Sequence, residues 1–400
     1  MSKTAYIVHL IEALGSGGAE RLLYTNLKRF DRSRFHSEVI TIFSNATHWK
    51  EPIQELGVEV TSLDCQNLRD LPKGVRRLRR ILQNSRPDLI HTHLWAANVI
   101  GRVTGRLSRV PVISSIHNPD HEPDAWDDGA EVGPLKRRLA RLMDRWTADF
   151  GCDRLVAVSE YVRRSAHRRL GFPLERIDLL YNPIDVDQFQ SAAPGKRQQL
   201  IEELGLPERS VILLNVARVS PQKGLLHAIR ALPAVREKYP EAQLVSVGAT
   251  VDQYWLSRLK AEAAGLGVAE QLHFLGARRD IPDLLRGCDL FVFPSLYEGL
   301  GISLIEAMAS GCACVASQAG PIPEVIRHGV DGWLVSPADP QALADAVCLL
   351  LADEEERKRL GAAAAASVLA RFHPETAARK LEGIYESVLG MPRSAIKQAA

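Results

Sequence analysis

The stretch that decides the fold is residues 275–324, LGARRDIPDLLRGCDLFVFPSLYEGLGISLIEAMASGCACVASQAGPIPE. An apolar strand is expected over 290–293, and it runs through a proline into a turn rich in glycine. Residues that favour helix follow over 304–308, and a second apolar strand is expected over 312–316. This order of strand, glycine turn, helix and strand predicts a parallel βαβ unit. Its loops would lie at the carboxyl ends of the strands, where open α/β sheets bind ligands.

Strand and helix signals also alternate through the remainder of the chain, in two successive runs. The first run covers residues 1–184 and the second covers residues 196–373. The polar segment 185–195 between them has no hydrophobic period and is expected to be a linker. A last long helix is expected after Pro374. The chain is therefore predicted to be an α/β protein with two Rossmann-like, doubly wound domains.

The composition narrows the class of protein. With 400 residues, 46% of them hydrophobic, and a formal net charge of +2, the chain has the composition of a packed globular protein and not of a nucleic-acid-binding protein. Its six cysteines form no C-x-x-C pair, which favours reduced thiols. His9 and Glu12 interrupt the first apolar run, so it does not resemble a signal peptide, and no stretch reaches the ~20 apolar residues of a spanning helix. These features predict a cytoplasmic protein.

Two cations mark the loop that is expected after the first strand of the second domain. Arg218 and Lys223 lie five positions apart there. A pyrophosphate needs positive partners, and this edge of the sheet is where a ligand would lie. The pair is therefore a candidate phosphate site, with a solvated loop carrying incidental charges as the alternative.

Two carboxylates mark the deciding stretch itself. Glu298 belongs to the glycine turn, and Glu306 lies about one turn into the following helix. Because a carboxylate accepts hydrogen bonds from two hydroxyl groups at once, the two acids suit a ligand rich in hydroxyls. A helix-surface acid and a capping acid are the alternative interpretation.

A glycine turn also opens the first helix of the chain, over residues 15–20, GSGGAE. Such a turn presents free backbone N–H groups and the positive end of the helix to an anion. A dinucleotide fingerprint is disfavoured because Glu20 stands where its last glycine would be. The turn is predicted to bind an anion, and a purely structural turn is the alternative.

Together these motifs resemble the retaining glycosyltransferases of family 4, whose members have the GT-B fold. The residues that carry the resemblance are Gly17-Gly18, Ile90-His91, His93, Ile116-His117, Arg218, Lys223-Gly224 and the segment 298–306, EGLGISLIE, which is similar to the E-x7-E motif of the family. The resemblance implies an acceptor domain over 1–184 and a nucleotide-sugar donor domain over 196–373, which face each other across a cleft. It also implies that a helix within 374–400 crosses back to the first domain.

The resemblance implies a role for each matched residue. Arg218 and Lys223 would hold the diphosphate of the donor, Glu306 would bind the ribose hydroxyls, and Glu298 would lie beside the transferred sugar. Donor binding would extend over the backbone amides of Gly299, Leu300, Gly301, Ile302 and Ser303.

In the first domain, the resemblance implies that His117 contacts the donor sugar and the acceptor. Gly17 and Gly18 would line the cleft near the phosphates or the acceptor. The implied catalytic residues are Glu298, His117, Lys223 and Arg218.

No metal and no cofactor is expected, since the family typically needs neither. His91 and His93 would share one face of a strand, but no third ligand is evident in the sequence. Asp185 and Asp187 have the spacing of an Asp-x-Asp site, yet they lie in the expected linker.

The helix expected over 134–150 is basic and amphipathic. One stripe carries Leu135, Leu139, Leu142 and Trp146, and the flanks carry Lys136, Arg137, Arg138, Arg141 and Arg145. Such a helix lies on an anionic membrane in some proteins, and packs its stripe into a core in others. A second arginine cluster over 76–80 favours peripheral contact with the inner face of the cell membrane.

The resemblance implies a metal-independent, retaining hexosyltransferase. It would move a sugar from a nucleotide-sugar, expected to be UDP-linked, to a glycan or lipid-linked saccharide precursor in cell-surface polysaccharide synthesis. Since no carboxylate is evidently placed as a nucleophile, front-face attack is favoured over double displacement. A nucleotide-sugar epimerase of the same fold and a non-catalytic nucleotide-sugar-binding subunit are the alternatives. A phosphorylase would need a pyridoxal lysine, for which there is no signature.

Overall fold

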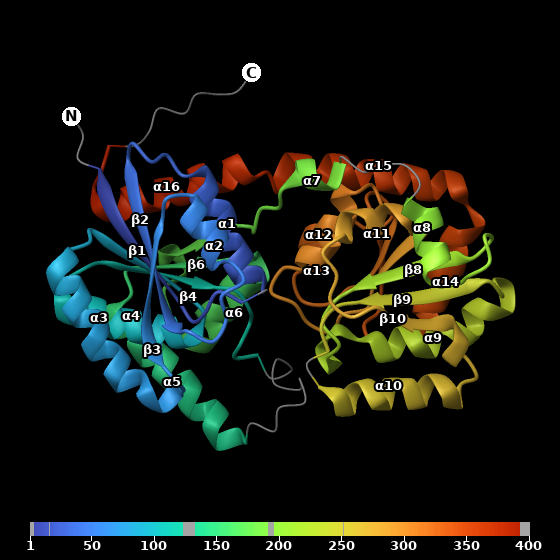
Figure 1. Cartoon of the computed structure of the whole chain (residues 1–400), viewed down its shortest axis with the longest axis horizontal. Helices are drawn as coiled ribbons and strands as arrows, with labels where there is room; N and C mark the ends of the chain where they lie inside the picture. Colours follow the sequence, from blue (N-terminus) through green and yellow to red (C-terminus); the bar gives the residue numbers. More distant parts are fainter. Residues whose placement is uncertain (1–3, 16, 123–132, 191–195, 251, 393–400) are drawn as a thin grey trace. The chain divides into compact units, whose positions relative to one another are not determined.

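The computed structural model describes the chain except for residues 1–3, 16, 123–132, 191–195, 251 and 393–400. The described residues form two compact units (Figure 1). One unit comprises the described parts of 4–183 together with 374–392, and the other comprises those of Ile184–His373. Each unit has its own sheet and its own core.

The first unit is built on a seven-stranded parallel sheet in the order β3-β2-β1-β4-β5-β6-β7. Its strands are β1 (Ala5–Ile11), β2 (Phe35–Phe43), β3 (Glu59–Cys65), β4 (Leu89–His93), β5 (Val112–Ile116), β6 (Arg154–Ala157) and β7 (Ile177–Leu179). Its helices are α1 (Gly18–Arg29), α2 (Lys50–Glu55), α3 (Leu71–Ser85), α4 (Trp95–Ser108), α5 (Pro134–Gly151), α6 (Glu160–Leu170) and α16 (Pro374–Leu389). The order reverses between β1 and β4, which makes the sheet doubly wound.

Helices cover both faces of this sheet because its strands are apolar on both sides. Side chains of α1, α2 and α16 pack on one face, and side chains of α3 and α4 pack on the other. All five residues of β4, Leu-Ile-His-Thr-His, are buried although three of them are polar. The polar residues of β4 therefore need partners inside the protein.

The second unit repeats this plan with a six-stranded parallel sheet in the order β10-β9-β8-β11-β12-β13. Its strands are β8 (Val211–Val216), β9 (Ala242–Val247), β10 (Leu272–Phe274), β11 (Leu290–Phe293), β12 (Cys314–Ser317) and β13 (Trp333–Val335). Its helices are α7 (Val186–Gln190), α8 (Lys196–Glu203), α9 (Leu225–Lys238), α10 (Gln253–Gly265), α11 (Ile281–Gly287), α12 (Ile302–Ala309), α13 (Ile322–Val325), α14 (Pro340–Ala352) and α15 (Glu354–Arg371). Two Rossmann-like units of parallel strands and helices, as predicted, are therefore present.

The deciding stretch forms the βαβ unit β11-α12-β12 at the centre of the second sheet. The second strand begins two residues later than expected, at Cys314. The amide of Cys312 instead donates a hydrogen bond to the carbonyl of Ala307 (3.1 Å), which closes the end of α12. Gly311 makes this ending possible because its φ is +75°.

The expected linker 185–195 begins as part of the second unit. Residues Val186–Gln190 form helix α7, which packs against α12. Val186 and Phe189 lie one turn apart, and both are buried. Residues 191–195 lie outside the described part of the chain, and the helix α8 begins directly after them. Two apolar residues in a polar segment were therefore enough to fold its first half onto the domain that follows.

The last helix returns to the first unit, which confirms the predicted crossing. Tyr385 of α16 is fully buried there. Glu382 accepts a hydrogen bond from the amide of Asp31 (2.7 Å), and Glu386 pairs with Arg34. Helix α16 is thus part of the core of the first unit, although more than 180 residues of the second unit separate it from the preceding strands.

Among the described residues, none of the helices combines the length and the apolar character that a membrane span requires.

Candidate active site

The loop after β8 and the loop after β11 are joined by backbone and side-chain contacts in the second unit. The carbonyl of Gln222 accepts from the amide of Leu296 (2.8 Å), and its side-chain amide donates to the carbonyl of Tyr297 (3.0 Å). Both loops follow central strands at their carboxyl ends. The sequence analysis did not identify Gln222, since a polar residue in a loop gives no sign of being buried.

A glycine makes this close approach possible. Gly224 follows the short 3-10 turn Pro221–Lys223 and has a φ of +63°. A Cβ atom at this position would lie 1.9 Å from the carbonyl oxygen of Pro294. No side chain fits in that space, which explains why the residue after Lys223 is a glycine.

The joined loops bring Lys223 and Glu298 together. Lys223 Nζ lies 2.8 Å from Glu298 Oε1, and only 14% and 9% of the two side chains are exposed. An ammonium group has three N–H donors, so Lys223 keeps donors for a second anion while it holds Glu298. The predicted phosphate-binding cation and the predicted sugar-binding acid therefore form one charged pair.

Glu306 lies one turn into α12, and the residues before it form the loop and the first turn of that helix. Glu306 is buried (5% exposed), as is Leu300, so Leu300 could offer only its backbone to a ligand. Gly301 caps the helix with a φ of +92°, and a Cβ atom on it would lie 3.0 Å from Ile322. The first amides of α12, at Ile302 and Ser303, are N–H groups without partners in the helical ladder. They are suited to an anion, as predicted for them and for Gly299.

Arg218 lies on the loop after β8, as predicted, and its side chain is exposed. Within the described part of the chain it makes no ion pair. The loop backbone beside it is tightly packed, because a Cβ atom on Gly248 would lie 1.9 Å from the carbonyl oxygen of Ala217. Arg218 is therefore an exposed cation on a closely packed loop, which suits a residue that meets a charged ligand.

In the first unit, Gly17 caps the N-terminus of α1, and Gly18 is its first residue. The carboxylate of Glu20 already approaches this turn, since a Cβ atom on Gly17 would lie 2.4 Å from Glu20 Oε2. Burial raises the pKa of Glu20. An anion bound at this turn would share it with a carboxyl group, which the sequence did not indicate.

His117 follows β5, where burial lowers its pKa to about 4, so its ring is neutral at pH 7. Its ring centroid lies 5.7 Å from that of His93. A neutral imidazole carries one hydrogen-bond donor and one acceptor, and both suit sugar hydroxyls.

The structure supplies the third histidine that the sequence did not reveal. His9 of β1 lies beside His91 and His93, and one ring nitrogen of each lies within 4.8 Å of the others. Ligands of a tetrahedral zinc ion lie closer, at ~3.3 Å from one another. Both ring nitrogens of His91 are also engaged, with Tyr385 Oη (2.6 Å) and Ser115 Oγ (2.8 Å). A metal would need the rings to move, so metal independence stays a prediction.

Two family models match the chain, one for each unit. The model described as "Glycosyltransferase Family 4" matches residues 16–188, and the model described as "Glycosyl transferases group 1" matches residues 196–367.

Curated relatives resemble the chain over most of its length. An Escherichia coli protein named UDP-Gal:alpha-D-GlcNAc-diphosphoundecaprenol alpha-1,3-galactosyltransferase is 26% identical over 72% of this chain and 73% of its own length. A D-inositol 3-phosphate glycosyltransferase of Xylanimonas cellulosilytica is 28% identical over 95% of this chain and 90% of its own.

Among solved structures, HepE of Anabaena, crystallised in complex with UDP and glucose, matches with a TM-score of 0.84 at 24% identity. The match covers 96% of this chain and 100% of HepE, and it shows that the two chains share a fold.

Proposed function

Because this chain belongs to family 4 of the glycosyltransferases and has the GT-B fold, we propose that it transfers a sugar from a UDP-linked donor with retention of configuration. The UDP in the HepE structure and in the name of the Escherichia coli relative supports this donor. The acceptor proposed is a glycan or lipid-linked saccharide precursor of cell-surface polysaccharide. The diphosphoundecaprenol in the name of the same relative supports this class of acceptor.

The observation that carries the proposal is the ion pair of Lys223 with Glu298 on the two joined loops. As UDP leaves the anomeric carbon, negative charge grows on its phosphate oxygens. Lys223, Arg218 and the first amides of α12 would stabilise this charge, which replaces the metal of other transferases. The buried acid Glu306 would accept hydrogen bonds from the ribose.

Glu298 is held by Lys223, so it is proposed to orient the transferred sugar by hydrogen bonds and not to attack it. A front-face route, in which the acceptor approaches from the side that UDP leaves, then accounts for retention. His117 in its neutral form is proposed to contact the sugars, and Gly17 and Gly18 to lie near the phosphates or the acceptor.

The test is turnover of Lys223→Ala and Glu306→Ala with a UDP-sugar and an acceptor. Each should lower kcat/KM by ~10²-fold or more, the magnitude seen when a preorganised charge donor is lost. Lys260→Ala, an exposed lysine on α10, is the control and should keep full activity. Near-normal transfer by both site variants would refute the assignment. Release of UDP only when acceptor is present would separate a transferase from an epimerase or a binding subunit.

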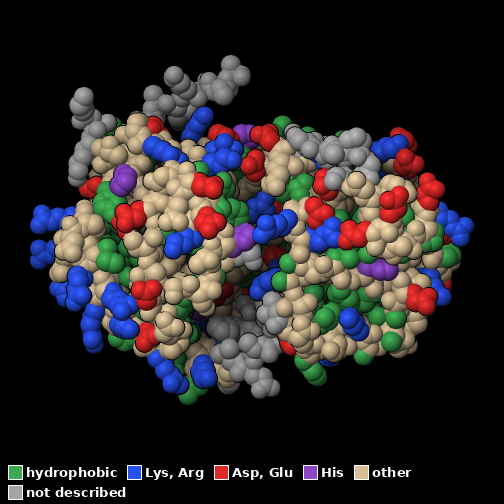
Figure 2. Space-filling model, viewed as in Figure 1, with side chains coloured by type: hydrophobic (Ala, Val, Ile, Leu, Met, Phe, Trp, Pro, Cys, Tyr) green, Lys and Arg blue, Asp and Glu red, His purple; other side chains and the backbone are tan. Residues whose placement is uncertain are grey.

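Helix α5 supports a second part of the proposal, peripheral contact with an anionic membrane. The stripe expected from the sequence is exposed, and it extends to Met143 and Phe150. The exposed fractions include 70% for Leu135 and 58% for Trp146, so the stripe does not pack into the core. Basic side chains gather over α3 and α5 on the lower left of the molecule (Figure 2).

The polar face of α5 is the face that packs inward. Asp144 is buried and accepts a hydrogen bond from Arg102 (2.5 Å) of α4 and one from His121 (2.7 Å). Thr147 and Ala148 are buried beside it. The helix is thus fixed by a charged contact while its apolar face points to solvent, an arrangement that suits the surface of a lipid bilayer.

Sedimentation with vesicles tests this contact. The protein should bind phosphatidylglycerol vesicles at low salt, and Trp146→Glu should bind at least tenfold more weakly because it places a charge on the apolar face. Equal binding of both proteins, or no binding at all, would refute membrane contact through α5. A cytoplasmic location on the inner face of the membrane is proposed on the same grounds.

A further inference from the structure

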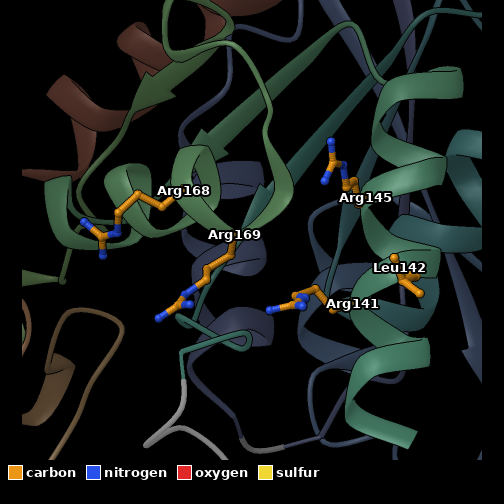
Figure 3. A pocket seen from close by; sticks show the side chains of 5 residues that line it. All are labelled: Arg141, Leu142, Arg145, Arg168 and Arg169. Carbon is orange, nitrogen blue, oxygen red and sulfur yellow. The ribbon is translucent and has the colours of Figure 1, made fainter. Parts of the chain in front are cut away.

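A pocket lined almost entirely by arginine lies between α5 and α6 in the first unit. Its volume is about 220 Å³, and its lining residues are Arg141, Leu142, Arg145, Arg168 and Arg169 (Figure 3). A water molecule occupies roughly 30 Å³ of liquid, so the space suits a larger group. Arg141 points from α5 toward α6, which supplies Arg168 and Arg169.

One acid balances two of the four guanidinium groups. Glu122 accepts hydrogen bonds from Arg168 (2.9 Å) and Arg169 (2.6 Å). Burial acts to raise the pKa of Glu122, but these two guanidinium groups lower it to about 2, so it is ionised. Glu122 therefore fixes Arg168 and Arg169 in place at the edge of the pocket.

Arg141 and Arg145 have no acidic partner among the described residues. Arg145 lies against the end of α6, where a Cβ atom on Gly171 would be 3.5 Å from its Nη2 atom. The carbonyl end of a helix attracts a cation, which accounts for Arg145 but not for Arg141. Among the described residues, the four guanidinium groups have one carboxylate partner, Glu122, which leaves an excess of three positive charges in this part of the protein. Guanidinium groups bind phosphate through paired hydrogen bonds, so this excess suits a phosphate anion.

The pocket adjoins the apolar face of α5. Leu142 lines the pocket and belongs to the exposed apolar stripe of that helix. An anion in the pocket would therefore lie beside the exposed apolar stripe that is proposed to contact the bilayer. This is the chemistry of a lipid that carries its charge as a diphosphate at the membrane surface.

We propose that the four-arginine pocket binds the diphosphate group of a lipid-linked saccharide acceptor. This inference rests on the proposed function, since it names the class of acceptor for that reaction. The phosphate headgroups of ordinary acidic lipids share part of this chemistry, and the experiment distinguishes the two sources.

Direct binding is measured first, by calorimetry with farnesyl diphosphate and with farnesol as soluble probes. The wild type should bind the diphosphate and not the alcohol. The double variant Arg141→Gln/Arg145→Gln should bind farnesyl diphosphate ~10²-fold more weakly, about tenfold for each lost charge-assisted contact. Arg379→Gln/Lys380→Gln, which removes two exposed cations from α16, should bind as the wild type does.

The single variant Arg141→Lys is a milder substitution, which still tests the pocket if the double variant does not fold. It keeps the charge but loses the paired hydrogen bonds, so it should bind farnesyl diphosphate several-fold more weakly. An unchanged affinity in both pocket variants, or an equal loss in the α16 variant, would overturn the proposal.

Kinetics and vesicles complete the test. With a lipid diphosphate saccharide as acceptor, the double variant should raise the acceptor KM ~10²-fold and leave the donor KM unchanged. If phosphatidylglycerol vesicles compete for the pocket as strongly as farnesyl diphosphate does, the site is one for general lipid headgroups and the proposal fails. The pocket and the proposed function can fail separately. If the wild type binds farnesyl diphosphate and the double variant does not, but the wild type transfers no sugar, the result supports the pocket and contradicts the proposed function.

Discussion

The substitution Gly224→Ala tests whether the close contact of two loops creates the site. Gly224 has a φ of +63°, and a non-glycine residue in this region costs ~1–2 kcal/mol by itself. The added Cβ would also lie 1.9 Å from the carbonyl oxygen of Pro294, which forces the loops after β8 and β11 apart. Overpacking of this kind typically costs a further ~1–3 kcal/mol. The total expected loss is therefore ~2–5 kcal/mol in the stability of the second unit.

Gly205 provides a control because it shares the backbone conformation of Gly224 but not its close contact. Its φ is +62°, but nothing lies within 4 Å of a Cβ atom built on it. Gly205→Ala should therefore lose only the ~1–2 kcal/mol that the backbone conformation costs. The difference between the two variants isolates the contact between the loops.

The assays are urea unfolding and sugar transfer. Gly224→Ala should unfold at lower urea than Gly205→Ala, with an unchanged slope. It should also lose ~10²-fold or more in kcat/KM, since the Lys223–Glu298 pair depends on the same contact. If the two variants unfold at the same urea concentration and transfer sugar equally well, the site does not depend on the contact between the loops, and this account of it is wrong.

Two further predictions concern the first unit and the absence of a metal. Burial lowers the pKa of His9 to about 3, so the unfolded chain binds a proton below about pH 6.5 that the folded protein does not. Stability is therefore full above about pH 6.5 and falls as the pH falls, by ~2 kcal/mol at pH 5 from His9 alone. His9→Leu should reduce this loss, as measured by urea unfolding of both proteins at pH 7 and pH 5, and an identical pH dependence would contradict it. Dialysis against EDTA should leave turnover and thermal stability unchanged, and a loss that Zn²⁺ or Mn²⁺ restores would contradict metal independence.

Elements with strong local signals were predictable within a few residues. Helix α6 runs over Glu160–Leu170, because Ser159 caps its start by accepting from the amide of Val162 (3.1 Å) and Gly171 ends it with a φ of +72°. The shorter helices α2, α8, α11 and α13 were not predicted. Short helices gain their stability from tertiary packing and not from their own sequence, so the sequence carries little sign of them.

The face on which α5 packs was also left open by the sequence. Its periodicity predicted an apolar stripe, and a stripe of this kind packs inward in most helices. In α5 the polar face packs inward instead, because the buried Arg102 forms an ion pair with Asp144 on the face opposite the apolar stripe. A partner 42 residues away therefore determined which face of the helix meets the solvent.

The sequence by itself determined the alternation of strands and helices, the two Rossmann-like domains and the chemical types of the site residues. These follow from local periodicity, from glycines with defined backbone requirements and from a motif contained within nine residues. Only the tertiary structure decided which of those residues act together. Lys223 meets Glu298 across 75 positions of sequence, and His9 meets His91 across neighbouring strands, because parallel sheets bring the carboxyl ends of distant strands to one edge.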